Sequence, residues 1–166
     1  MSRTDDLAAT ADVATARLRA WLKLLKLARA VSGDLRERLR TGHATTLPQF
    51  DVMAALYRAE QGLTMSALSE ALMVSNGNVT GIVERLVADG LVVRVPVEGD
   101  RRATLVRLTT RGREGFAAMA AVHRGWVSDA LGGLTTGEAE QLTALLDKAR
   151  PTEARPAGTR PTEAGP

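Results

Sequence analysis

The stretch from residue 75 to residue 113 reads SNGNVTGIVERLVADG, LVVRV, PVEGDRR and ATLVRLTTRGR. Ser75 is a favourable N-terminal helix cap, and the pair Asp89-Gly90 is typical of a helix C-terminus. Two short runs rich in β-branched residues follow, separated by a turn with one glycine and four charged side chains. The stretch therefore predicts a helix over 76–88 and a basic β-hairpin directly after it.

The sequence on both sides of this stretch has helical periodicity. Apolar residues recur at intervals of three and four along residues 13–39, which predicts one long amphipathic helix over about 13–40. Thr46, followed by Pro48, and then Thr64 mark the starts of two shorter helices. A tight turn over 72–74 joins the second of them to the helix over 76–88, which makes a helix-turn-helix unit.

These elements give the predicted fold class, which is mainly α with a small β-hairpin wing. A winged helix-turn-helix over about 46–110 lies between an N-terminal helix over 13–40 and C-terminal helices within 111–149. Residues 1–12 are polar, and we expect a flexible N-terminus there. The segment 150–166 contains Arg-Pro-Thr-Glu-Ala twice and no large apolar residue, so a disordered Arg/Pro-rich tail is expected.

Composition excludes several classes of site. The 166 residues include no cysteine, which excludes disulfides, thiolate sensing and iron–sulfur clusters, and only two histidines, too few for a histidine metal site. No signal peptide or membrane-length apolar run is present, so a cytoplasmic protein is expected. We expect no cofactor, no metal and no membrane partner.

Charge is unevenly distributed, although the formal net charge is only +3. Residues 94–113 contain six arginines against two acidic residues, and residues 13–40 contain eight basic residues against two acidic ones. Positive clusters of this kind can attract a polyanion, but each can also be a solvated face.

The helix and hairpin supply residue types that suit DNA recognition. Asparagine pairs with adenine in the major groove, threonine can contact a base or a thymine methyl, and glycine permits close approach. Arginine and serine suit phosphates, and an arginine at a hairpin tip can enter the minor groove, where Asp100 would hold it in place. Ser69 is a further phosphate candidate. The predicted DNA-binding residues are Ser66, Ser75, Asn76, Asn78, Thr80, Gly81, Arg85, Asp100, Arg101 and Arg102.

Each element also has a plainer explanation when it is taken alone. An asparagine-rich helix start can simply be a well-capped helix, and an arginine-rich turn can simply be a solvated loop. The combination, in this order and spacing, favours DNA binding over both.

The chain resembles the MarR family of winged helix-turn-helix regulators. The matching segments are LPQFDV at 47–52, LTMSALS at 63–69, VTGIVERLVADGLV at 79–92, and the wing signature Asp100-Arg101-Arg102 followed by Leu108-Thr109 and Gly112. The resemblance covers about residues 13–149. It implies an obligate homodimer formed by the first and last helices, bound to a pseudo-palindromic operator of double-stranded DNA. It also implies that Arg102 is the minor-groove arginine and that Asp100 positions the wing.

The resemblance further implies a small-molecule effector, often an aromatic acid, bound between the dimerisation helices and the DNA-binding lobe. A basic first helix would also suit an aromatic acid carried as its coenzyme A thioester. For each candidate, core packing, dimer packing or a solvated position is the alternative. The candidates are Arg17, Trp21, Leu25, Arg29, His43, Phe50 and Trp126.

We therefore predict a dimeric, ligand-responsive transcriptional repressor. The alternative is a winged-helix module that dimerises or binds proteins without an operator of its own. An enzyme is disfavoured because the sequence has no nucleophile–base set, phosphate loop or metal cluster.

Overall fold

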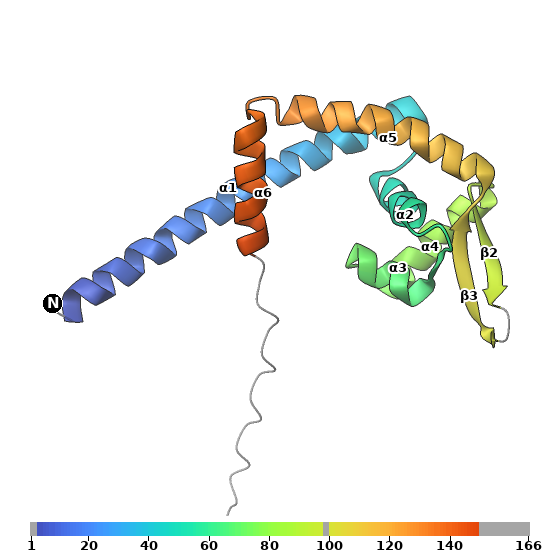
Figure 1. Ribbon diagram of the computed structural model, residues 1–166, viewed down its shortest axis with the longest axis horizontal. Coiled ribbons are helices and arrows are strands. Elements are labelled where there is room, and N and C mark those ends of the chain that lie inside the picture. Colours follow the sequence, from blue (N-terminus) through green and yellow to red (C-terminus); the bar gives the residue numbers. More distant parts are fainter. Residues whose placement is uncertain (1–2, 98–99, 150–166) are drawn as a thin grey trace, which may run out of the picture. The chain divides into compact units, whose positions relative to one another are not determined.

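The computed structural model describes residues 3–97 and 100–149, and within this part the side chains of residues 12–96 and 104–149. The chain divides into two compact units, residues 1–130 and residues 131–166. The elements are α1 (Arg3–His43), α2 (Leu47–Arg58), β1 (Leu63–Thr64), α3 (Met65–Leu72), α4 (Asn76–Ala88), β2 (Val92–Val97), β3 (Asp100–Leu108), α5 (Thr110–Ala130) and α6 (Thr136–Lys148). The predicted fold class, mainly α with a small β wing, is confirmed (Figure 1).

The sheet is antiparallel with strand order β1-β3-β2. β2 and β3 form the predicted hairpin, with Val92 opposite Leu108 and Arg94 opposite Val106. The short strand β1 was not predicted, and it pairs Leu63 with Val106 on the other side of β3. The hairpin is thereby anchored to the helical lobe along two strands instead of one.

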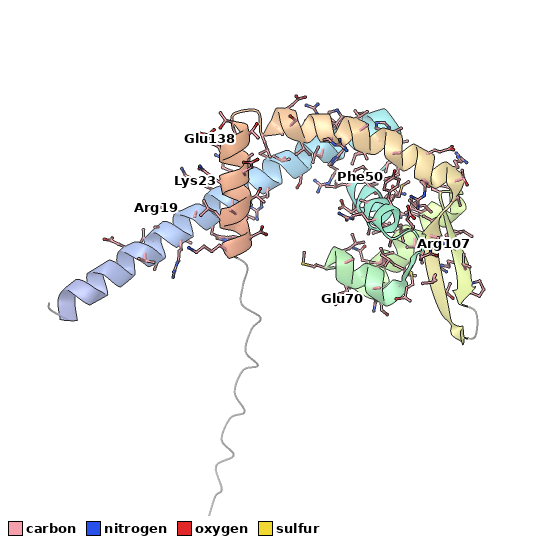
Figure 2. The ribbon with its side chains drawn as sticks, in the orientation of Figure 1. Arg19, Lys23, Phe50, Glu70, Arg107 and Glu138 are labelled. Atoms are coloured by element: carbon pink, nitrogen blue, oxygen red, sulfur yellow. The ribbon has the colours of Figure 1, made fainter. Side chains whose placement is uncertain are left out.

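The core lies where α2, α3 and α4 meet the sheet. Val52, Met53, Leu68, Val79 and Val106 are each 0% exposed. Phe50 lies between α2 and α5, with its ring centroid 5.2 Å from that of Phe116 (Figure 2). Burial of these side chains is what fixes α4 and the hairpin relative to each other.

Threonine caps at Thr46 and Thr64 confirm two of the predicted helix starts in the lobe. The last helix begins with a capping box of Thr135 and Glu138. The hydroxyls of Thr46, Thr64 and Thr135 accept hydrogen bonds from backbone N–H groups in the first turns of α2, α3 and α6. Ser75 behaves differently, because its backbone has cap geometry but its side chain makes no capping hydrogen bond. The prediction that its hydroxyl caps α4 is therefore wrong, and that hydroxyl is exposed.

The first helix is longer than its apolar periodicity predicts. α1 begins at Arg3, so residues 3–12, which we expected to be a flexible N-terminus, are helical. It also continues through the break expected at residues 41–44 and ends at His43, after which Ala44 adopts a positive φ of 49°. None of the described helices is long and apolar enough to cross a membrane. The predicted tail, 150–166, lies outside the described residues.

Candidate nucleic-acid interface

Helix α4 presents a polar N-terminal face to solvent. Val79, Val83 and Leu86 are buried against the core, which turns the opposite side of the helix outward. On that outward side lie three of the predicted DNA-binding residues, Asn78, Gly81 and Arg85, and Asn76 is exposed in the first turn of the helix. They are therefore available to a groove of DNA without any rearrangement of the lobe.

Thr80 is partly committed within the helix. Its side chain is half-buried, and its hydroxyl donates a hydrogen bond to the carbonyl of Asn76 at 2.9 Å. The hydroxyl proton is thus occupied, while the oxygen lone pairs can still accept a hydrogen bond.

The two glycines of α4 are not required by packing within the chain. A Cβ built at Gly77 or Gly81 would meet no atom of the described residues within 4 Å. Glycine inside a helix lowers its stability by roughly 1 kcal/mol relative to alanine, so both residues weaken α4. A surface free of side chains at these positions favours close approach by something outside the chain.

The two serines of α3 have different positions. Ser66 is exposed, as a phosphate contact requires. Ser69 is buried, and its hydroxyl donates to the carbonyl of Met65 at 2.9 Å. The suggestion that Ser69 could reach a phosphate is therefore wrong.

A compact joint holds the hairpin at the C-terminal end of α4. The Thr109 hydroxyl donates to the Gly90 carbonyl at 2.9 Å and accepts from the Gly112 N–H at 3.0 Å. Gly90 itself has a φ of 69°, a left-handed conformation that suits glycine. At Gly112 a Cβ would collide with the Leu91 carbonyl, so α5 begins in direct contact with the base of the hairpin. This joint fixes the direction in which the wing leaves the lobe (Figure 1).

The six arginines of residues 94–113 do not all face one partner. Arg107 turns back into the lobe, where its guanidinium lies 3.4 Å from the Glu60 carbonyl and its stem packs on Gly62 (Figure 2). Arg113 lies over the Tyr57 ring at 5.0 Å and 3.8 Å from the Glu60 carboxylate. The local positive excess predicted from the sequence is therefore partly internal.

Arg94 is exposed on β2. The wing-signature residues Asp100, Arg101 and Arg102 form the beginning of β3, next to the hairpin turn. Their side chains lie outside the part of the chain described in atomic detail, so their roles remain predictions.

Three of the predicted ligand residues come together in an aromatic cluster on α1, α2 and α5. The rings of His43 and Trp126 are 5.9 Å apart, and His123 lies between Trp126, at 6.3 Å, and Phe50, on which it stacks at 4.4 Å. The Arg38 guanidinium covers Trp126 at 5.8 Å. His123 and Arg38 were missing from the predicted set.

The cluster perturbs two ionisable groups. Burial lowers the pKa of His123 below its ordinary value of 6.5, and the nearby Asp51 carboxylate raises it by a smaller amount. Burial also raises the pKa of Asp51, although its side chain keeps contact with solvent, and the charge of His123 opposes that shift. A neutral imidazole therefore packs on Phe50 at neutral pH.

The other four predicted ligand residues lie on the first helix, away from the contacts of this cluster. Arg17 is exposed, Trp21 is 55% exposed and Leu25 is half-buried. Arg29 lines a surface hollow of about 350 Å³ with Ala28, Ser32 and Arg36. Within the described chain, the seven candidates thus form two groups rather than one.

The basic face of α1 is largely without ion pairs within the described residues. Arg38 pairs with Asp34 at 2.8 Å and Arg40 pairs with Glu37 at 2.6 Å. The hydrogen bond and charge of Arg40 lower the pKa of Glu37. Six other cations on residues 13–40 form no ion pair with a described residue: Arg17, Arg19, Lys23, Lys26, Arg29 and Arg36. Figure 2 shows Arg19 and Lys23 on this helix.

Residues 44–103 match the family model described as MarR family. The chain is 40% identical over 77 residues to the transcriptional activatory protein BadR of Rhodopseudomonas palustris, a match that spans 45% of this chain and 44% of BadR. It is 35% identical over 105 residues to the regulator PecS of Dickeya dadantii, across 60% of this chain and 61% of PecS. The matched region thus spans less than two thirds of either relative.

The alignments with solved structures cover a larger share of those chains than the sequence matches cover of BadR and PecS. A MarR family regulator from Silicibacter pomeroyi aligns with a TM-score of 0.70 and 34% identity over 82% of this chain and 94% of that one. A variant of E. coli MarR complexed with operator DNA aligns with a TM-score of 0.70 and 29% identity, over 77% and 91%. Bordetella bronchiseptica BpsR, whose DNA binding is regulated by 6-hydroxynicotinic acid, aligns with a TM-score of 0.69 and 25% identity, over 78% and 97%.

The relatives are transcriptional regulators and not enzymes. The fold of this chain aligns with that of the solved regulators over about four fifths of its length. The chain belongs to the MarR family of winged helix-turn-helix transcriptional regulators.

Proposed function

We propose that this chain is a homodimeric repressor that binds a pseudo-palindromic operator and leaves it when a small aromatic acid binds. The observation that carries the proposal is the exposed N-terminal part of α4, where Asn76 and Asn78 lie beside Gly77, and where no contact within the described chain requires Gly77 or Gly81 to be glycine. A helix of this kind can lie deep in the major groove, with its asparagines against adenine edges.

The remaining DNA contacts divide by position. Ser66 at the start of α3, Ser75 before α4 and Arg85 in the last turn of α4 are exposed and suit phosphates, which fix register but carry no sequence information. Thr80 and Gly81 line the base-facing surface. Arg101 and Arg102 lie at the start of β3 beside the turn, where Arg102 would enter the minor groove and Asp100 would hold the wing.

A dimer follows from surfaces that the single chain leaves uncovered. Leu18, Trp21 and Leu22 on α1 are each more than half exposed, as is Leu145 on α6. Apolar side chains gathered along a helix in this way are normally covered by a partner. A symmetric pair of lobes would match the two half-sites of an operator, about one helical turn apart.

The effector would occupy the region of the aromatic cluster. His43, Phe50 and Trp126 offer ring faces, Arg38 a cation, and the basic face of α1 with Arg17 and Arg29 a positive approach. Trp21 and Leu25 lie away from this cluster on α1 and would contact the effector only if the second chain of the dimer brought them to it. This chemistry suits an aromatic carboxylate, or its coenzyme A thioester where the ligand carries more negative charge. BpsR, which responds to 6-hydroxynicotinic acid, supports an effector of the first kind.

The DNA-binding part is tested by fluorescence anisotropy on a duplex that the wild-type protein selects from a randomised pool. Arg102→Ala should weaken binding about 10- to 100-fold, since a groove arginine contributes roughly 1–3 kcal/mol. Arg124→Ala, an exposed arginine near the far end of α5 from the wing, is the matched control and should bind normally. Wild-type affinity should fall steeply with salt as counterions are released.

Unchanged binding by Arg102→Ala together with a flat salt response would instead favour a dimerisation module without its own operator. Sedimentation equilibrium on both variants establishes whether the dimer is intact.

The effector part is tested by adding aromatic carboxylates, and separately their coenzyme A thioesters, to the preformed DNA complex. A member of either set should release the wild-type protein, and Trp126→Ala should require more of it. Failure of both sets to release the DNA would contradict this part alone. A reporter gene behind the selected operator decides between repression and activation.

A further inference from the structure

Met73 is the residue at which α3 ends and the turn towards α4 begins. Its backbone is left-handed, with φ 53° and ψ 40°, and its side chain is 92% exposed. The conformation is held in place, because the Met73 N–H donates to the Glu70 carbonyl and the Val74 N–H to the Ser69 carbonyl, both at 3.1 Å. Met73 therefore stands at a fixed point of the surface.

Neither property of Met73 helps the chain to fold. A residue with a side chain is strained in the left-handed region, where glycine is not. The other described non-glycine residue with a positive φ is Ala44, whose side chain is small. The Met73 side chain removes almost none of its apolar surface from water, so it gains little hydrophobic stabilisation. A long apolar side chain held at a fixed and exposed point is available for a contact outside the chain.

The position of Met73 indicates the partner. Two residues later comes Ser75, whose hydroxyl caps nothing, and then Asn76 at the start of the helix assigned above to the major groove. Val74 beside it is also partly exposed, but Glu70, Ser75 and Asn76 on either side are polar and exposed, so the apolar surface here is narrower than the patch that a protein partner would need. In the major groove the apolar group that a side chain can contact is the C5-methyl of thymine.

We propose that Met73 contacts a thymine methyl at the edge of each half-site and so determines part of the operator sequence. The inference rests on the proposed DNA-binding function. A methionine suits this task because it is unbranched, flexible and polarizable, and can follow the groove edge from a fixed backbone. Val74, 38% exposed, extends the apolar contact beside it.

The test compares Met73→Gly with the wild-type protein on the duplex selected by the wild type, and on copies in which single thymines are replaced by deoxyuridine. Deoxyuridine keeps every hydrogen-bonding group and removes only the methyl. Met73→Gly should unfold at the same temperature as the wild type or higher, since glycine relieves the left-handed strain. Its affinity should fall about fivefold per half-site, the loss expected for one apolar contact.

One symmetric pair of thymines should weaken wild-type binding by a similar factor when replaced, yet have no effect on Met73→Gly. Met73→Leu, which keeps an apolar side chain, should retain the sensitivity to deoxyuridine. Wild-type affinity in Met73→Gly, or losses that simply multiply, would overturn the assignment. If Arg102→Ala still weakens binding in that case, the proposed function survives; if the wild type selects no sequence at all, both fail.

Discussion

The DNA-binding lobe and the N-terminal half of α1 are both rich in apolar residues, but they bury them differently. In the lobe, Val79 and Val83 are 0% exposed and Leu86 is 1% exposed. On α1, Leu18 is 57% exposed, and Trp21 and Leu22 are each 55% exposed. The lobe obtains its hydrophobic stabilisation within one chain, whereas the N-terminal half of α1 leaves these three side chains largely uncovered, and in the proposed dimer a second chain would cover them.

This difference separates two kinds of stability. The lobe should unfold at a free energy that does not depend on protein concentration, while the ordering of α1 should depend on it through mass action. It also explains how a regulator can keep its recognition helix rigid while the spacing between two such helices remains adjustable. In the proposed dimer, the adjustable part would be the part that the second chain completes.

The largest expected effect comes from truncating one leucine in each region. Leu68 is 0% exposed in the lobe, so Leu68→Ala should lower the free energy of unfolding by about 2–5 kcal/mol at any protein concentration. Leu22→Ala should barely change the free energy of unfolding of the lobe, but it should raise the dissociation constant of the dimer. Urea denaturation at low and high protein concentration, with sedimentation equilibrium, distinguishes the two. An undiminished dimer in Leu22→Ala would mean that this face of α1 is not the interface.

A second comparison uses two glycines of α5. A Cβ at Gly112 would collide with the Leu91 carbonyl, which is backbone and cannot move aside cheaply. Gly112→Ala should therefore destabilise the lobe by about 1–3 kcal/mol, the usual range for overpacking. Gly115→Ala is the control: its Cβ would meet nothing within 4 Å, and it should stabilise the helix by roughly 1 kcal/mol. Equal behaviour of the two variants in thermal denaturation would mean that the joint at Thr109 does not constrain the wing.

The sequence was sufficient for elements whose signal is local. The periods of 3.6 and 2 residues identify α4 and the hairpin, and the threonine caps at 46, 64 and 135 form as their residue types predict. β1 was not predicted because two residues are too few to show a periodic pattern, and they form a strand only through pairing with β3. The helix over residues 3–12 was not predicted because this segment has no stripe of apolar residues at helical spacing.

The candidate site shows the same limit. Residue type and position predicted that Asn76 and Asn78 are exposed at the start of α4, but Ser75, which has the backbone geometry of a cap, makes no capping hydrogen bond with its side chain. Charge along the sequence could not show that Arg107 and Arg113 turn towards Glu60. His123 was missing from the predicted ligand residues. Its stacking on Phe50 depends on how α2 and α5 pack, which no local pattern contains.

The smallest expected effect concerns the pH dependence of the free energy of unfolding at His123, which packs α5 against Phe50 of α2. Burial holds the folded pKa of His123 below 6.5, so the unfolded chain binds a proton more readily than the folded one. Its contribution to stability is therefore complete above pH 6.5 and is lost as pH falls from there through the lowered folded pKa. The raised pKa of Asp51 acts oppositely and in a more acidic window, since stability is lost as pH rises from 3.8 through the folded pKa.

His123→Phe keeps a ring against Phe50 and removes the proton, so the loss of unfolding free energy below pH 6.5 should become shallower. Asp51→Asn should make it steeper, because it removes the carboxylate that raises the pKa of His123. Urea denaturation across this range, together with NMR titration of the imidazole, measures both changes. If His123→Phe lost unfolding free energy below pH 6.5 as steeply as the wild type does, the His123 imidazole would not be the group responsible for the acid sensitivity. In that case, the packing of α5 on α2 would not depend on pH through His123. In the proposed dimer, the spacing of the two lobes would then be determined by the contacts of α1 alone.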